Sequence, residues 1–364
     1  FEYHCMEDNL LKLDMLGHDD PTMIKMLEDL TGVNARAIPL DDPDTMSIFT
    51  SSKVLGFEND EILGPTGAVA IPEFNTRFTR GMLMDTMPKD FNTLVRLSGF
   101  SHGTDVWLGN ARELIVSGTA SVLQTVGCRD DIMLYLISMG LDPKMSFKIM
   151  EAVRKGKVKK GGFQEGWEEA MRDHEVPDWY IGSLAKIGYL FPKAHAVAYV
   201  MMAFRIAWFK VHEPLAFYAT FFSIRAKAFD AEYCCAGLDA VKQKIKEIEN
   251  NKDATDVEQN LMVTLEVCYE FYLRGFHFDT IDIYKSDATR FKITENGLLP
   301  PFVTVRGLGE TAALDTVEKR KGKTFISVEE FANTCSKLSK THIEQLKALG
   351  AFAGMADTSQ VSLF

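Results

Sequence analysis

FPKAHAVAYVMMAFRIAWF, residues 191–209, contains the longest apolar run of the chain. The run extends over residues 194–209 and is interrupted by His195 and Arg205. It falls short of the roughly 20 residues that a membrane-spanning helix needs, so we do not expect the chain to span a membrane. The stretch instead predicts a core helix with Lys193 and His195 at its start.

Helical patterning extends from this stretch in both directions, over about residues 20–250, and indicates a large α-helical domain. A strand end is predicted at Leu10–Gly17, and a small β element is predicted at Thr280–Tyr284 and Arg290–Thr294. Further helices are expected at Glu310–Lys319, Val328–Cys335 and Thr341–Leu349. The predicted fold class is therefore mainly α with small β elements (α+β). Three glycine-bearing loops are expected to contact ligands: Gly64–Gly67, Gly99–Gly103 and Gly156–Gly162.

The composition excludes several classes of protein. The chain has 364 residues, of which 46% are hydrophobic and 25% are charged. This length predicts two or three globular units and excludes a collagenous, disordered or disulfide-stapled chain. The six cysteines include no Cys-x-x-Cys pair. We therefore expect reduced thiols in a cytoplasmic protein and no zinc site.

Charge is unevenly distributed along the chain. The formal net charge is −11, and residues 1–62 hold 14 acidic and only 4 basic side chains. Basic runs stand at Arg154–Lys160 and Lys319–Lys323. Because nucleic-acid contact depends on local charge, the acidic total does not exclude it. The sequence starts at Phe1 without a signal-peptide pattern, and we interpret it as the C-terminal piece of a longer chain.

The turn Gly307-Leu308-Gly309, between apolar residues and a helix, is typical of a helix-hairpin-helix. Two glycines allow consecutive backbone N–H groups to point outward beside a helix N-terminus, where they hold a phosphate oxygen. An ordinary turn between helices is the alternative. The nearby basic residues favour DNA binding: Lys319, Arg320, Lys321, Lys337, Lys340 and His342.

Three other motifs carry chemistry. Lys193 and His195 at a helix start favour a polyphosphate, and Tyr199 one turn later is placed to stack on a base or to be core. Asp14 after Lys12 fits a Mg²⁺ ligand beside a phosphate-binding ammonium, but these residues alone favour a solvated surface pair, since one aspartate cannot make a two-metal site. The terminal residues Gln360, Ser362, Leu363 and Phe364 fit a peptide anchor or a frayed end.

Taken together, these strings resemble a known family. KLDMLGHDD, IPEFNTRF, SGFSHGTDVWLGN, GCRDDIM, RKGK, VPDWY, FPKAHAVAYV and QVSLF occur in this order. They resemble the C-terminal part of the catalytic α subunit of bacterial DNA polymerase III, in its PolC type. The resemblance implies a palm remnant at residues 1–20, fingers at 21–285, a tandem helix-hairpin-helix domain at 286–352 and a flexible clamp-binding tail at 353–364.

The resemblance also assigns roles to residues. Asp14 matches the third metal-binding aspartate of the palm, and Lys12 a lysine that faces the triphosphate. Nucleotide-binding positions are implied at Arg129, Lys193, His195, Arg77, Ser101, His102 and Tyr199. DNA-binding positions are implied at Gly307, Leu308, Gly309, Arg154, Lys155, Lys157, Lys319, Arg320 and Lys321. Clamp-binding positions are implied at Gln360, Ser362, Leu363 and Phe364.

The implied function is template-directed DNA synthesis with two Mg²⁺ ions, of which this chain supplies one ligand. The implied partners are primer–template DNA, an incoming dNTP, the sliding clamp and other replisome subunits. One alternative is a non-catalytic DNA-binding and clamp-docking module. Another is a helix-hairpin-helix glycosylase or repair nuclease. The glycosylase is disfavoured because Glu310, Thr311 and Ala312 follow the hairpin, where a lyase needs a lysine.

Overall fold

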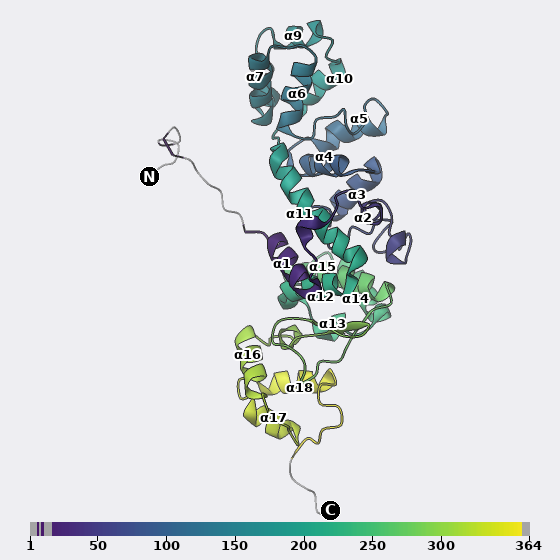
Figure 1. Cartoon of the computed structure of the whole chain (residues 1–364), viewed down its shortest axis with the longest axis vertical. Coiled ribbons are helices and arrows are strands. Elements are labelled where there is room, and N and C mark those ends of the chain that lie inside the picture. The colour runs from purple at the N-terminus through teal and green to yellow at the C-terminus, as the bar shows by residue number, and fades with distance from the viewer. Residues whose placement is uncertain (1–5, 7–8, 11–16, 359–364) are drawn as a thin grey trace, which may run out of the picture.

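The computed structural model describes residue 6, residues 9–10 and residues 17–358. These residues form an elongated molecule in which helical layers are stacked end to end (Figure 1). One end contains these helices: α3 (Arg77–Thr86), α4 (Phe91–His102), α5 (Arg112–Val116), α6 (Arg129–Ser138), α7 (Pro143–Arg154), α8 (Lys157–Gly161), α9 (Trp167–Asp173) and α10 (Asp178–Lys186). The predicted strand at Leu10–Gly17 lies mostly outside the described residues.

The middle of the molecule is built around α11 (Lys193–His212), which starts where the sequence predicted. The helices around and below it are: α1 (Asp20–Thr31), α2 (Pro43–Ser47), α12 (Pro214–Ile224), α13 (Ala231–Cys234), α14 (Leu238–Asn250) and α15 (Asp256–Leu273). Short 3₁₀ turns lie at Ala35–Ala37, Lys53–Leu55, Ala226–Ala228 and Phe302–Thr304, and a kinked π-type turn at Trp107–Ala111. The predicted helical domain is confirmed.

Helix α11 is longer than the apolar run from which it was predicted. It has 20 residues and is, among the described helices, the one that is long and apolar enough to cross a membrane by length and composition. It also packs against α1, α2, α4 and α12, and the side chains of Val200, Phe204 and Phe209 are fully buried. The core helix of a folded domain meets the same criterion, and these contacts place α11 in the core.

A buried ion pair fixes α11 against its neighbours. The Lys210 ammonium is fully buried, lies 2.7 Å from a Glu270 carboxylate oxygen of α15 and donates to the carbonyl oxygens of Gly67 and Val69. The Tyr218 hydroxyl of α12 donates to the same carboxylate at 2.6 Å. Burial lowers the pKa of Lys210 to about 8, against the opposing effect of Glu270. Helices α11, α12 and α15 and the 67–69 segment thus meet at one buried charge whose hydrogen bonds are all made within the protein.

Two predicted loops are helical. Gly99–His102 belongs to α4, whose N-cap Asp90 accepts a hydrogen bond from the Thr93 N–H. Lys157–Gly161 forms the short helix α8. In α4, a Cβ atom at Gly99 would lie 2.4 Å from the Gly127 carbonyl oxygen. This glycine therefore serves close packing within a helix and does not mark a loop.

The β element is smaller than predicted. Strand β3 (Gly297–Leu299) pairs in parallel with β1 (His277–Phe278) and antiparallel with β2 (Lys292–Ile293). Thr280–Tyr284 is not a strand, because the Asp282 carboxylate accepts the N–H groups of Tyr284 and Lys285 and turns the chain. The expected domain boundary after residue 285 passes between β1 and its partner β3.

The last unit contains α16 (Glu310–Lys319), α17 (Val328–Thr334) and α18 (Lys340–Ala348), within one residue of the predicted helices. Ser327 and Ser339 cap the last two helices through their hydroxyl groups. Figure 1 shows this unit at the end of the molecule opposite α6 and α7.

Replacing Lys210 by methionine is expected to lower the free energy of unfolding by about 3–5 kcal/mol, because Glu270 is then buried without its cation. Urea unfolding of the chain measures the change. Lys242→Met is the matched control: this lysine is partly exposed and pairs with Glu61 at the surface, so a loss below about 1 kcal/mol is expected. Equal losses in both variants would contradict a special role for the buried pair.

Candidate functional site

The starts of α6 and α11, more than 60 residues apart in the sequence, meet in the structure. The Arg129 N–H donates to the Phe191 carbonyl oxygen at 3.1 Å, and the Lys193 N–H donates to an Asp130 carboxylate oxygen at 2.8 Å. The positive ends of two helices therefore lie side by side. Arg129 and Lys193 extend from them, with 37% and 36% of their side chains exposed.

Asp131 connects these two helix starts to α4. Its carboxylate accepts the N–H groups of Gly127 and Cys128 and pairs with Arg96 at 3.1 Å and with the Lys193 ammonium at 3.3 Å. Burial, and next the charge of Asp131, raise the pKa of the Cys128 thiol to about 12. Cys128 is therefore a packed, unreactive thiol beside the cluster.

Five aromatic rings form a continuous chain along the start of α11. The ring centroids of His102 and Phe191 are 4.9 Å apart, those of Phe191 and His195 4.5 Å, and those of His195 and Tyr199 4.2 Å. His18 continues the chain at 4.6 Å from Tyr199. Segments that lie before α1, in α4 and at the start of α11 thus converge on one row of rings.

Glu73 holds one end of this row. Its backbone has a positive φ of 67°, and its carboxylate accepts a hydrogen bond from the Ser98 hydroxyl at 3.1 Å and pairs with His102 Nε2 at 2.5 Å. The hydrogen bond with Glu73 raises the pKa of His102. Burial alone would raise the pKa of Glu73, but His102 and Ser98 outweigh it and lower this pKa. Burial, and next the charge of His102, lower the pKa of His195.

Comparison with known proteins shows what the chain is similar to. Residues 20–175 match the bacterial DNA polymerase III alpha subunit finger domain, and residues 275–361 match the helix-hairpin-helix motif. The whole chain is 54% identical to a DNA polymerase III PolC-type from Caldanaerobacter subterraneus subsp. tengcongensis. It is 51% and 50% identical to proteins of the same name from Halalkalibacterium halodurans and Streptococcus mutans.

The chain is homologous to part of the PolC-type DNA polymerase III. It aligns over its full length and spans 26% of the Caldanaerobacter relative and 25% of the other two. The resemblance drawn from the sequence is confirmed, as are a finger domain and a helix-hairpin-helix. The finger match ends at residue 175, whereas the prediction extended the fingers to residue 285.

The structure brings together most of the nucleotide-binding residues that the PolC resemblance implied. Arg129, Lys193, His195, His102 and Tyr199 surround the start of α11. Ser101 is close to them but donates to the Ser98 carbonyl oxygen of its own helix.

Arg77 does not join this group. It lies at the start of α3, where it pairs with Glu249 of α14 and, at 3.5 Å, with Glu266 of α15. The hydrogen bond with Glu249 is the main cause that raises the pKa of the guanidinium, and it outweighs burial. The Arg77 side chain is 63% exposed and connects α3 with α14 and α15 at the surface.

Sequence reasoning missed several members of the site. Asp130 and Asp131 stand in the string GCRDD, but their pairing with Lys193 is long-range. Arg96 gave no signal, and Glu73 and His18 stand in the strings IPEFNTRF and KLDMLGHDD without having been singled out. Nothing local marks a side chain whose partner is 25 or more residues away. The positive φ of Glu73, which places its carboxylate beside His102, can be seen only in the structure.

The predicted DNA-binding turn is a glycine turn directly before α16, in which the Leu308 N–H donates to the Val305 carbonyl oxygen at 3.0 Å. Gly307 has a φ of 77°, Leu308 is buried, and Gly309 is the N-cap of α16. The Arg306 side chain, just before the turn, pairs with Asp230 at 2.7 Å and lies over the Tyr233 ring.

The basic residues near this turn differ in their availability. Arg320 is 8% exposed, donates to the carbonyl oxygens of Ile283 and Ser286, and lies over the Phe302 ring. Its predicted contact with DNA is therefore corrected to a structural role. Lys319 pairs with Asp315 at 3.3 Å, whereas Lys321 is exposed and pairs with the exposed Glu318 at the end of α16.

The described residues do not fit a metal centre. Within residues 6, 9–10 and 17–358, no three His, Cys, Asp or Glu side chains gather closely enough to hold an ion. Asp14, Lys12, Gln360, Ser362, Leu363 and Phe364 lie outside the described residues. Their predicted roles stay predictions.

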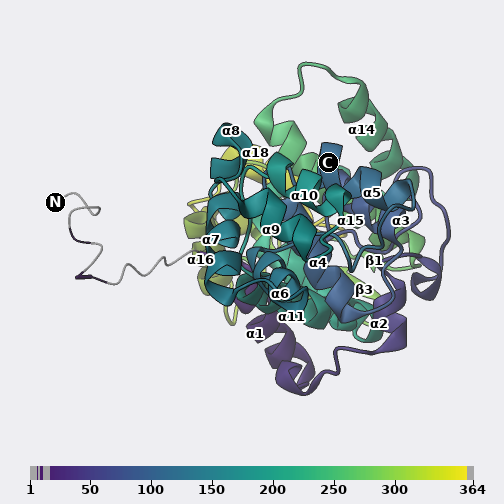
Figure 2. The same ribbon diagram turned by 90° about the horizontal axis from the view of Figure 1, so that it is seen from above.

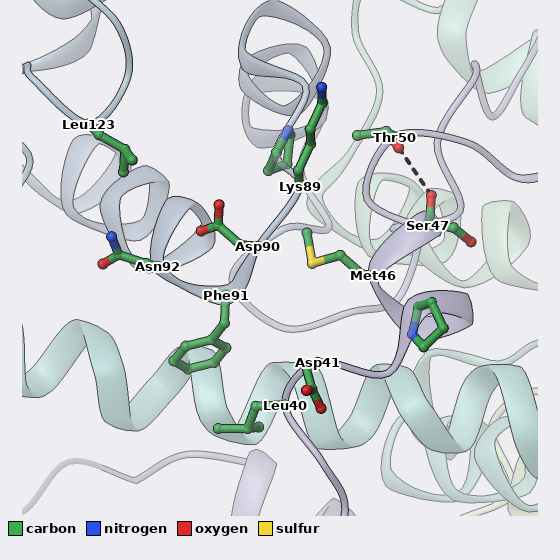
Figure 3. A pocket seen from close by; sticks show the side chains of 12 residues that line it. Leu40, Asp41, Met46, Ser47, Thr50, Lys89, Asp90, Phe91, Asn92 and Leu123 are labelled. Carbon is green, nitrogen blue, oxygen red and sulfur yellow. Dashed lines mark hydrogen bonds between the residues drawn. The ribbon is translucent and has the colours of Figure 1, made fainter.

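A separate pocket of about 800 Å³ lies between α2 and the start of α4 (Figure 3). Figure 3 shows the Met46 side chain between Lys89, Asp90 and Phe91, with Leu40 below. The Asp90 carboxylate already caps α4. This pocket contains none of the predicted site residues.

Gly99→Ala is expected to destabilise the chain and to move the start of α6, because the new methyl group meets the Gly127 carbonyl oxygen and Cys128 Sγ. Gly81→Ala is the matched control, since Gly81 is also inside a helix but has nothing within 4 Å. We expect this variant to be more stable by about 0.5–1 kcal/mol. Thermal unfolding compares the two; equal shifts would contradict the close packing at Gly99.

His102 is expected to titrate above the usual histidine pKa, and Glu73→Gln is expected to lower its pKa by removing the carboxylate. Because the folded pKa is raised, this interaction stabilises the fold at low pH and is lost as the pH rises through that pKa. Histidine NMR titration measures the shift. Asp42→Asn, which changes the partner of the distant His212, should leave His102 unaffected; an unchanged His102 in Glu73→Gln would contradict the pairing.

Proposed function

We propose that this chain supplies the finger and duplex-binding parts of a DNA polymerase that adds deoxynucleotides to a primer as its template directs. In this reaction the primer 3′ hydroxyl attacks the α-phosphate of a deoxynucleoside triphosphate, and pyrophosphate leaves. The chain spans about a quarter of its PolC-type relatives. The proposal therefore concerns the part of the work that its own residues do.

The paired helix starts of α6 and α11 carry this proposal. The first N–H groups of both helices, those of Arg129 and Lys193, donate within the protein. The positive ends of the two helix dipoles still lie together here and favour an anion. Arg129 and Lys193 add partly exposed positive charge, and the raised pKa of His102 favours its charged form. This combination fits a polyanion such as a triphosphate. We expect the bound triphosphate to draw the Lys193 ammonium away from Asp131.

The row of rings supports a place for the rest of the nucleotide. His195 and Tyr199 lie on one face of α11, one turn apart, and their rings are stacked at an interplanar angle of 28°. Flat rings beside a phosphate site offer a surface for a base or sugar. The Glu73 contact with His102 fixes the other end of the row. Specificity for the base then comes from the template strand, which the protein does not need to read.

Duplex binding is proposed for the turn at residues 307–309. Its glycine backbone and the start of α16 present N–H groups to a phosphate, which positions a duplex without reading its sequence. Lys321 and Lys319 are the nearby cations. Arg154, Lys155 and Lys157 form a second basic region at the end of α7 and the start of α8, where Glu151 pairs with the first two. For this region we propose contact with DNA without assigning it to the duplex.

Other parts of the proposal rest on the resemblance alone. Asp14 is proposed as one Mg²⁺ ligand with Lys12 beside the triphosphate, and the terminal residues 360–364 as the anchor to the sliding clamp. Contacts with other replisome subunits and a cytoplasmic location are proposed on the same basis. The tasks proposed for the described residues are to bind phosphates and to position the nucleotide and the duplex, since these residues do not form a metal site.

The test is triphosphate binding by the chain. We expect dNTP to protect the starts of α6 and α11 from hydrogen exchange, and Lys193→Ala to weaken dNTP binding about 10-fold or more, since a charged hydrogen bond is lost. Binding of blunt duplex should stay within about twofold, because α11 begins in the upper half of the molecule and α16, which follows the 307–309 turn, lies at its lower end (Figure 1). Fluorescence titrations with labelled dNTP and labelled duplex measure both.

Arg172→Ala is the matched control. Arg172 is an exposed cation on α9 that pairs with Glu168 and Asp178, so neither titration should change. If the chain binds duplex but shows no triphosphate-dependent protection, it acts as a non-catalytic DNA-binding module. That result would refute the nucleotide-binding part of the proposal.

A further inference from the structure

We propose that the outer face of α7 and α8 binds single-stranded DNA, with Phe147 as a stacking platform for an unpaired base. This inference rests on the proposed function and adds a binding surface to it. We call this surface the α7–α8 track and define it by Lys144, Phe147, Lys148, Lys155, Lys157 and Lys160.

Helical spacing places the first part of the track on one face. Lys144, Phe147, Lys148 and Lys155 are separated by three, one and seven residues, which a helix of 3.6 residues per turn brings to the same side. The opposite face of α7 is buried through Ser146, Ile149, Met150 and Val153. One face of α7 therefore packs against the core. No described residue covers its other, outer face.

Charge on the track is largely uncompensated. Residues 143–160 hold seven lysines and arginines and one carboxylate, Glu151, although the chain as a whole is acidic. Glu151 pairs with Arg154 and Lys155, and Lys159 pairs with Asp105. In the described part of the chain, Lys144, Lys148, Lys157 and Lys160 take part in no ion pair. Four unpaired ammonium groups on two adjoining helices, α7 and α8, fit a phosphate backbone.

Phe147 distinguishes single-stranded from double-stranded DNA as the occupant. Half of this residue is exposed, and it lies between the two lysines at the outer face. A duplex shields its bases and presents only phosphates to such a helix. An unpaired base can stack on the ring while the lysines hold the phosphates on either side.

The track is joined to the candidate nucleotide site by the backbone. Gly156, with a φ of 65°, allows α8 to turn against Gly188, where a Cβ atom would lie 2.4 Å from a carbonyl oxygen. The Leu190 N–H donates to the Arg154 carbonyl oxygen at 3.3 Å. Leu190 is followed directly by Phe191, whose ring belongs to the row at α11. Figure 2 shows α7 and α8 on the same side of the molecule.

This continuity favours the unpaired template as the strand that occupies the track. A template strand must pass the nucleotide site in single-stranded form before it is copied. Along α7, Lys144 and Lys155 lie roughly 16 Å apart at 1.5 Å per residue. A strand on this face would therefore reach the 188–191 segment and then the start of α11.

The experiment measures binding of the chain to fluorescein-labelled oligothymidylate and to a blunt duplex of equal length. We expect Phe147→Ala to weaken single-strand binding about fivefold or more, the loss of one stacked base, and to leave duplex binding unchanged. Phe147→Trp keeps a flat ring and should retain single-strand binding. Lys144→Gln with Lys148→Gln should reduce the salt slope of single-strand binding by about 1.4, from two phosphates.

Matched controls lie at the other side of the molecule. Lys252→Gln and Val257→Ala change an exposed lysine and a 77% exposed apolar side chain beside α15, and neither should alter binding. If Phe147→Ala leaves single-strand binding intact, or weakens both DNAs equally, the inference is wrong while duplex binding by residues 307–309 stands. If the unaltered chain binds neither DNA, the proposed function fails as well.

Discussion

The arrangement of the molecule depends on one interaction, the buried ion pair between the Lys210 ammonium and the Glu270 carboxylate. It lies near the end of α11 and joins this helix to α12, α15 and the 67–69 segment through one charge. The other end of the same helix is fixed by Asp130, which accepts the Lys193 N–H. A helix of 20 residues is roughly 30 Å long and stiff. Because both ends of α11 are fixed, the row of rings at its start lies at a set distance from the Lys210–Glu270 pair near its end.

Several elements could be predicted from the sequence because their determinants are local. Proline before Lys193 and glycine before Glu310 mark helix starts within a few residues, and α11 and α16 begin as predicted. Long-range contacts gave no such signal. Arg320 stands in a basic run, yet it is buried against backbone carbonyl oxygens more than 30 residues away. The first glycine of SGFSHG is predicted as a loop residue, although it packs one helix on another.

The candidate site shows how an acidic protein prepares positive surfaces. Carboxylates at the site are engaged: Asp131 with Arg96 and Lys193, and Glu73 with His102. These pairs set the position of each cation, and Arg129 has its own partner in Asp130 at 3.9 Å. The outer lysines of α7, Lys144 and Lys148, have no such partner among the described residues. Local pairing, and not the total charge, thus decides where an anion is attracted. The same logic separates Lys321, which is exposed, from the buried Arg320.

The Cys128 thiol has a consequence for redox chemistry. Burial, and next the charge of Asp131, raise its pKa to about 12, so the thiol form predominates at neutral pH. Peroxide and electrophilic drugs react with thiolates, so they have little to attack at the start of α6. Oxidative stress therefore spares Cys128. A maleimide added to label an introduced surface cysteine would not react with Cys128 as well.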